Sequence, residues 1–126
     1  MPNLVHYFEI PVSDLDRATI YYERVLGIKM ERATIDGYEM ALFPYVEGQP
    51  GSSGALAKGD VYVPSRNGPI LYFTVADIDA ALARAHAAGS KILSPKKDIG
   101  DAGYVAEVED SEGNRLALSQ PVEESK

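Results

Sequence analysis

The sequence contains no cysteine and has few basic residues. Without cysteine the chain has no disulfide framework, no thiolate zinc site and no cysteine nucleophile. Its 12 Lys and Arg face 19 Asp and Glu, which gives a formal net charge of −7. Binding to a nucleic-acid backbone needs clustered cations, so we expect no nucleic-acid partner. We interpret the single basic run, Lys96-Lys97, as solvated loop charge.

Long hydrophobic runs are also missing. No stretch is apolar over enough residues to span a bilayer, so we expect no membrane partner. The first residues, Met1 to His6, have neither the basic segment nor the sustained apolar run of a secretory signal. We therefore expect a cytoplasmic protein.

The length of 126 residues is typical of one domain, because two independent cores would each be too small. Hydrophobic residues make up 45% of the chain, which is enough for one packed interior. We predict a single domain over residues 1–126, with a first module at about 4–60, a second at about 69–120 and a frayed tail at 121–126.

Two segments carry the same pattern. Tyr7–Asp16 and Ile70–Asp79 are each a short alternating run that ends in Asp-aliphatic-Asp. An apolar stripe with helical spacing follows each run, and Gly27 and Gly89 end the two predicted helices, because glycine adopts the left-handed conformation at little cost. The chain therefore contains an internal repeat.

Three predicted strands follow each helix. The Asp36-Gly37 pair is a strong two-residue hairpin signal within the first set. Pro64 and Asn67-Gly68 mark residues 61–68 as a connector between the modules. The predicted strands are residues 28–34, 38–43 and 55–57 in the first module, and 91–93, 104–108 and 115–118 in the second. The order βαβββ, repeated twice, predicts an α+β fold.

The repeat has a known counterpart. Together with the strand end Val12-Ser13-Asp14-Leu15, the helical stretch Tyr21–Gly27 and the last hairpin Glu109–Arg115, it resembles the vicinal oxygen chelate superfamily of glyoxalase I, bleomycin-resistance proteins and extradiol dioxygenases. The resemblance runs from about Leu4 to Gln120. It implies two modules whose curved mixed sheets surround a central cup for ligand, and a homodimer. In catalytic members, four side chains from the first and last strands of the two modules hold a divalent metal.

The resemblance also implies where those metal ligands belong. The positions fall on Tyr7, on Ile70, on Ala117 and within residues 55–57, and none of them supplies a suitable donor. His6 lies one residue before Tyr7 and points to the opposite face, because strand side chains alternate. Since a divalent ion needs about four protein donors, we predict no metal and no other cofactor.

Glu9 is the first candidate functional residue. It shares a strand face with Tyr7, since residues two apart point the same way. We predict that Glu9 is a catalytic base or the partner of a cationic ligand, and that Tyr72, at the matching position of the second module, joins it in catalysis. The alternative is that Glu9 is exposed, or is hydrogen-bonded at a sheet edge.

Further ligand-binding candidates come from the later strands. Glu107 interrupts an apolar strand, and Arg115 shares the face of Ala117. Arg115 is expected to meet Glu107 or a ligand carboxylate, or to form a surface salt bridge. Lys58 follows the fourth strand of the first module, where it either approaches ligand or is solvated. Tyrosines on or beside strands, which suit a planar or aromatic ligand, are Tyr7, Tyr38, Tyr45, Tyr62, Tyr72 and Tyr104.

These observations leave three hypotheses. The first is a metal-free protein that binds a small planar or aromatic molecule, either to sequester it or as an accessory subunit. The second is a lyase or isomerase in which Glu9 is the base and tyrosine hydroxyls stabilise the developing charge. The third is a metal-dependent glyoxalase or dioxygenase. Whether the protein is an enzyme is therefore left open.

Overall fold

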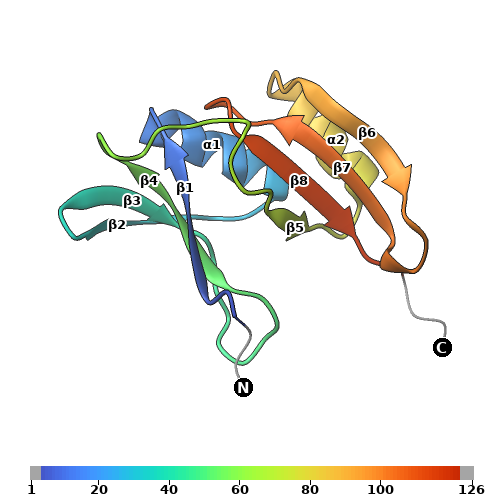
Figure 1. The fold of residues 1–126 in the computed structure, drawn as a ribbon, viewed down its shortest axis with the longest axis horizontal. Helices are drawn as coiled ribbons and strands as arrows, with labels where there is room; N and C mark the ends of the chain where they lie inside the picture. The colour runs from blue at the N-terminus through green and yellow to red at the C-terminus, as the bar shows by residue number, and fades with distance from the viewer. Residues whose placement is uncertain (1–3, 123–126) are drawn as a thin grey trace.

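A computed structural model describes residues 4–122 and contains two βαβββ modules (Figure 1). The first module consists of β1 (Tyr7–Val12), α1 (Leu15–Leu26), β2 (Glu31–Ile35), β3 (Tyr38–Leu42) and β4 (Ser53–Lys58). The second consists of β5 (Tyr72–Thr74), α2 (Ile78–Ala87), β6 (Ile92–Asp98), the short 3₁₀ helix η1 (Gly100–Ala102), β7 (Tyr104–Glu109) and β8 (Arg115–Gln120). The predicted α+β fold is confirmed.

Each module has its own four-stranded mixed sheet, with strand orders β1-β4-β3-β2 and β5-β8-β7-β6. The first strand of each module lies at an edge and pairs in parallel with the last strand, whereas the other pairs are antiparallel. In Figure 1 the two sheets lie beside each other, with β1 and β5 near the middle of the molecule. The edges of the two sheets therefore bound the region between the modules.

Both helices start at an aspartate cap, and α1 ends at the glycine that the sequence predicts. The Asp14 carboxylate accepts a hydrogen bond from the Arg17 N–H at the start of α1, and Asp77 does the same for Ala80 at the start of α2. Gly27 ends α1 with a left-handed φ of 67°. These caps satisfy N–H groups that lack partners within the helix. The helices are therefore fixed locally, before packing is considered.

One core serves both modules. The side chains of β1 and β4 that face α1, and those of β7 and β8 that face α2, belong to a single buried cluster with the helices. Tyr22 of α1 is fully buried in this cluster, and its ring packs edge to face on Phe43. The opposite faces of the two sheets are left outside this shared core, and we call them the open faces.

Strand β6 is longer than the sequence indicated. It runs to Asp98, so Lys96 and Lys97 lie on a strand, and their assignment to a loop was wrong. Pro95 hides the pattern, because proline cannot donate to a ladder and is confined to edges and irregularities. The register between β6 and β7 shifts on both sides of Ser94. Lys96 is paired with Asp79, at a distance of 3.0 Å between Nζ and Oδ2.

Strand β4 also begins earlier than expected, at Ser53. Gly54 is part of this strand, and the ring of Phe8 on β1 lies directly over it. A Cβ at this position would stand 2.1 Å from the Phe8 ring. Only glycine therefore lets the aromatic side chain pack against β4 at this point.

Candidate functional site

The open face of the first module contains the residues singled out on β1. In the strand register Glu9 is next to Ala55, and Met40 is next to Ala57. The side chains of Met40, Ala55 and Ala57 form a small buried cluster of their own, separate from the shared core. Tyr7 and Glu9 lie on this same face, as strand alternation predicts. The floor around Glu9 is therefore apolar.

Two tyrosine hydroxyls donate hydrogen bonds to the Glu9 carboxylate. Tyr62 donates to Oε1 at 2.7 Å, and Tyr7 donates to Oε2 at 2.9 Å. We call Tyr7, Glu9 and Tyr62 the Glu9 cluster. Tyr62 comes from the connector, where its ring packs edge to face on Tyr38 with 5.2 Å between centroids. The connector thus brings a hydrogen-bonding side chain to the open face of the first module.

The Glu9 carboxylate affects both phenols. The pKa of Tyr62 is raised to about 12, mainly because its hydroxyl donates a hydrogen bond to Glu9. The pKa of Tyr7 is also raised to about 12, first by burial and then by its hydrogen bond to Glu9. Both hydroxyls therefore remain protonated, and able to donate, at neutral pH.

The open face of the second module carries Tyr72, Glu107 and Arg115. In the register Tyr72 and Glu107 each lie beside Ala117. The Arg115 guanidinium donates a hydrogen bond to the Glu107 carboxylate, one of the outcomes that the sequence left open. Both side chains are partly buried in this pair. The glutamate on this face is therefore already paired with a cation.

A hollow of about 320 Å³ lies between the modules and brings Glu9 and Arg115 together. We call it the inter-module hollow. Its apolar lining includes Phe8 of β1, Tyr22 of α1 and Phe73 of β5, and the connector borders it. A cavity of a few hundred Å³ with apolar walls and a few polar groups is typical of a small-molecule site.

Of the six predicted site residues, Glu9 and Arg115 line this hollow, and Tyr7 and Glu107 are hydrogen-bonded to them from outside its lining. The other two lie elsewhere. Tyr72 is 54% exposed and lines a neighbouring hollow of about 340 Å³, which shares Phe8 and Phe73 with the first. Lys58 pairs with Val12, whose side chain belongs to the shared core. Lys58 therefore does not share the open face with Glu9. It lines a polar hollow at the start of α1. The functional roles of Tyr72 and Lys58 stay predictions.

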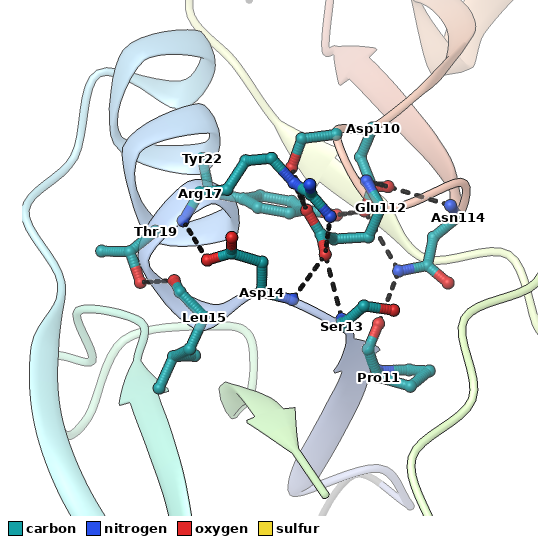
Figure 2. A network of polar contacts seen from close by, with 11 residues as sticks. Pro11, Ser13, Asp14, Leu15, Arg17, Thr19, Tyr22, Asp110, Glu112 and Asn114 are labelled. Atoms are coloured by element: carbon teal, nitrogen blue, oxygen red, sulfur yellow. Dashed lines mark hydrogen bonds and ion pairs between the residues drawn. The ribbon is translucent and has the colours of Figure 1, made fainter.

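The turn between β7 and β8 contacts the start of α1 in the first module through side-chain hydrogen bonds (Figure 2). No role was predicted for this turn from the sequence. The Glu112 carboxylate accepts hydrogen bonds from the backbone N–H groups of Ser13 and Asp14, both at 2.9 Å. It also accepts from the Arg17 Nε at 2.7 Å. Burial acts to raise the pKa of Glu112, but hydrogen bonds led by that of Arg17 lower it to about 2.

Two further side chains of this turn reach the first module (Figure 2). Asn114 donates to the Pro11 carbonyl at 2.7 Å and accepts from the backbone N–H of Ser65 at 2.9 Å. Asp110 accepts from the Tyr22 hydroxyl at 2.6 Å, and its burial raises its pKa. The signal in the sequence was four polar side chains in a five-residue turn before an apolar strand. Three of them bond to partners in the first module that are 88 to 103 residues away, and these partners could not be read from the turn.

The family model of the Glyoxalase/Bleomycin resistance protein/Dioxygenase superfamily matches residues 4–118, which include both modules. The chain belongs to this superfamily. A comparison with curated proteins finds no match. The resemblance read from the repeat is therefore confirmed at the level of the family.

Solved structures of this superfamily share the fold. A glyoxylase/bleomycin resistance protein/dioxygenase domain from Frankia sp. EAN1pec has a TM-score of 0.72 at 21% identity, covering 99% of this chain and 96% of that one. TnmS3, an antibiotic binding protein from Streptomyces sp. CB03234, has 0.64 at 22%, covering 96% and 98%. The fosfomycin resistance protein FosX from Listeria monocytogenes has 0.67 at 17%, covering 100% and 96%.

The metal of catalytic superfamily members does not fit the residues present here. In the strand register Ala55 pairs with Glu9, Ala57 with Met40 and Ala117 with Glu107, and an alanine side chain offers no donor to a metal. Among residues 4–122, no three His, Asp or Glu side chains are grouped as metal ligands. A divalent ion needs several N or O donors at once. The expectation that no cofactor is bound stays a prediction.

No helix within residues 4–122 has the length and apolar character needed to cross a membrane. The expected cytoplasmic location also stays a prediction.

Proposed function

We propose that this superfamily member binds a small planar or aromatic organic molecule in the inter-module hollow, without a metal. The observation that carries the proposal is the lining itself. Aromatic side chains, Phe8 and Phe73 among them, surround the hollow, and Glu9 and Arg115 place one acidic and one basic group in it. Aromatic walls bind flat molecules through buried area and ring geometry, while a few polar groups fix their orientation.

The relatives support a binding function of this kind. TnmS3 is an antibiotic binding protein, and FosX is a fosfomycin resistance protein. One is named for binding an antibiotic and the other for resistance to one. A protein that binds and sequesters a small organic ligand, or presents it as an accessory subunit, needs no metal chemistry.

The test is a ligand-observed NMR screen of planar aromatic compounds, with binders mapped on the protein by amide shifts. Val63 lines the hollow and is 72% exposed, so Val63→Trp blocks the hollow without disturbing the core. Val61→Trp is the matched control, because Val61 is 66% exposed on the same connector and does not line the hollow. Binding should weaken at least about tenfold in the first variant only. Equal binding by both variants would overturn the proposal.

A second candidate is a lyase or isomerase that uses Glu9 as general base. The specific observation is the Glu9 cluster, in which a half-buried carboxylate meets two protonated phenols that are able to steady a developing charge. Tyr72, the proposed partner in catalysis, lies in the neighbouring hollow. Glu9→Gln should abolish turnover if Glu9 is a base and leave aromatic binding largely intact. Retained turnover in the variant rules this candidate out.

We also propose that the protein is a cytoplasmic homodimer. Ile70 and Tyr72, just before and on the edge strand β5, are about half exposed. Exposed apolar side chains that gather at a sheet edge are typical of an interface. Light scattering of the purified protein should give twice the 13.7 kDa chain mass. A monomer at micromolar concentration contradicts this proposal, and cell fractionation checks the location.

A further inference from the structure

The Glu9 carboxylate has no cationic partner in the part of the chain that the structure describes. The ion pairs found among residues 4–122 involve other acids: Asp16, Asp79, Glu107, Glu109 and Glu112. Glu9 instead accepts hydrogen bonds from two neutral phenols. Its negative charge is therefore uncompensated.

The surroundings make that charge costly. Ala55, Ala57 and Met40 form a buried, apolar floor, and Glu9 is half-buried against it. Partial burial of a charge costs free energy unless a partner offsets it. A carboxylate offers about four acceptor positions, and Tyr7 and Tyr62 occupy two of them. Acceptor capacity and the full charge remain for a ligand.

The surroundings of Glu9 offer aromatic rings for a cation. Phe8 and Phe73 line the inter-module hollow together with Glu9. Tyr7 and Tyr62 contact the same carboxylate from outside the lining of the hollow. Cations are attracted to the faces of aromatic rings, and a carboxylate among such rings adds direct charge pairing. Neutral or anionic groups would leave Glu9 uncompensated.

The other charged group in the inter-module hollow does not oppose a cation strongly. Arg115 is already paired with Glu107, so the two charges largely cancel at that end. The negative potential in the hollow is therefore set by Glu9. This difference orients a ligand, with its cationic group toward β1.

We propose that the ligand carries a cationic nitrogen, either a protonated amine or a quaternary ammonium, attached to its planar part, and that this nitrogen pairs with Glu9. The proposal rests on the proposed binding function of the inter-module hollow and names the chemical class of its ligand. No covalent step is involved.

The experiment compares two probes of nearly equal shape at pH 7. 1-Naphthylmethylamine is protonated there, and 1-naphthylmethanol is neutral. Titration by ligand-observed NMR should give about tenfold tighter binding of the amine, the size expected for one partly desolvated charge pair. Added salt should reduce that preference.

Glu9→Gln should bring the two probes to within about twofold of each other, since the amide keeps the shape and removes the charge. Glu39→Gln is the matched control, because Glu39 is an exposed strand glutamate of the same module that does not line the hollow. Its preference for the amine should be unchanged. Tyr62→Phe keeps the ring and removes one hydrogen bond to Glu9, so it should keep or increase the preference.

The outcomes separate the two proposals. Equal binding of the amine and the alcohol to the wild-type protein overturns the cationic-ligand proposal and leaves the binding function standing. An amine preference that survives Glu9→Gln also overturns it, because another group must then supply the charge. Failure of both probes and of the wider aromatic screen overturns the proposed function itself.

Discussion

Each module places a glutamate on its open face, and the two are satisfied in different ways. Glu9 of β1 is held by the neutral hydroxyls of Tyr7 and Tyr62, whereas Glu107 of β7 is held by the Arg115 guanidinium. The two modules therefore share a fold but differ in the net charge of their open faces. Tyr62 explains much of the difference, because it comes from the connector and not from either repeat.

The difference shows how two modules of one fold come to favour different ligands. In the second module Arg115 neutralises Glu107, so this glutamate needs no charged ligand group as a partner. The first module leaves a net negative charge among aromatic rings, so its face is complementary to a cation. Substitutions in each module, and at the turn that connects them, test this difference.

The largest effect is expected from Gly54→Ala, which deforms the first module alone. The added Cβ would stand 2.1 Å from the Phe8 ring, so the ring must leave its place on β4 and in the inter-module hollow. Overpacking of this kind should cost about 3 kcal/mol of unfolding free energy. Urea denaturation measures it. Gly68→Ala is the control, since no atom lies within 4 Å of its added Cβ, and a similar loss there would contradict the explanation.

Glu112→Gln should weaken the contact between the β7–β8 turn and the start of α1. It should lower the unfolding free energy by about 2 kcal/mol, because a charged acceptor of several hydrogen bonds is removed. The folded-state pKa of Glu112 is lowered from 4.5 to about 2. Its stabilising contribution is therefore complete above about pH 4.5 and is lost as the pH falls toward 2. Thermal unfolding of both proteins from pH 7 to 2 checks this.

The stability difference between wild type and Glu112→Gln should shrink across that acidic window. A difference that stays constant down to pH 2 would show that the carboxylate charge is not what holds the turn to Ser13 and Asp14.

Glu9→Gln should change the titration of its two tyrosine partners unequally, while costing only about 1 kcal/mol of stability. The pKa of Tyr62 should fall from about 12 toward 10, because the hydrogen bond to Glu9 is its main cause. The pKa of Tyr7 should fall less, since burial is its first cause. NMR of ¹³C-labelled tyrosine measures both, and Glu107→Gln is the control that should leave them unchanged.

The smallest effect is expected at the second module. A double-mutant cycle of Glu107→Gln and Arg115→Gln should give a coupling free energy below about 1 kcal/mol, because the pair is partly exposed and water screens it. Chemical denaturation of the four proteins measures the coupling. A coupling of several kcal/mol would mean that the pair is structural, and the contrast between the modules would need a different explanation.

The sequence predicted the architecture well because its signals are local. Alternation placed Tyr7 and Glu9 on one face, and the Asp36-Gly37 pair predicted a turn in which both residues have positive φ. The end of β6 was missed because Pro95 and two register shifts disguise the strand. The predicted strand 55–57 left out Gly54, because the Phe8 ring that requires this glycine is far away in the sequence.

The amino-acid sequence by itself determined the two βαβββ modules, their family and the face on which each candidate side chain lies, because these follow from periodicity along the chain. Only the tertiary structure decided that Tyr62 meets Glu9, that Arg115 meets Glu107 and that Glu112 binds the start of α1. Except for the pair on the β7–β8 hairpin, these contacts join segments 50 or more residues apart. Such partners are chosen by the packing of the modules, and no local pattern in the chain encodes them.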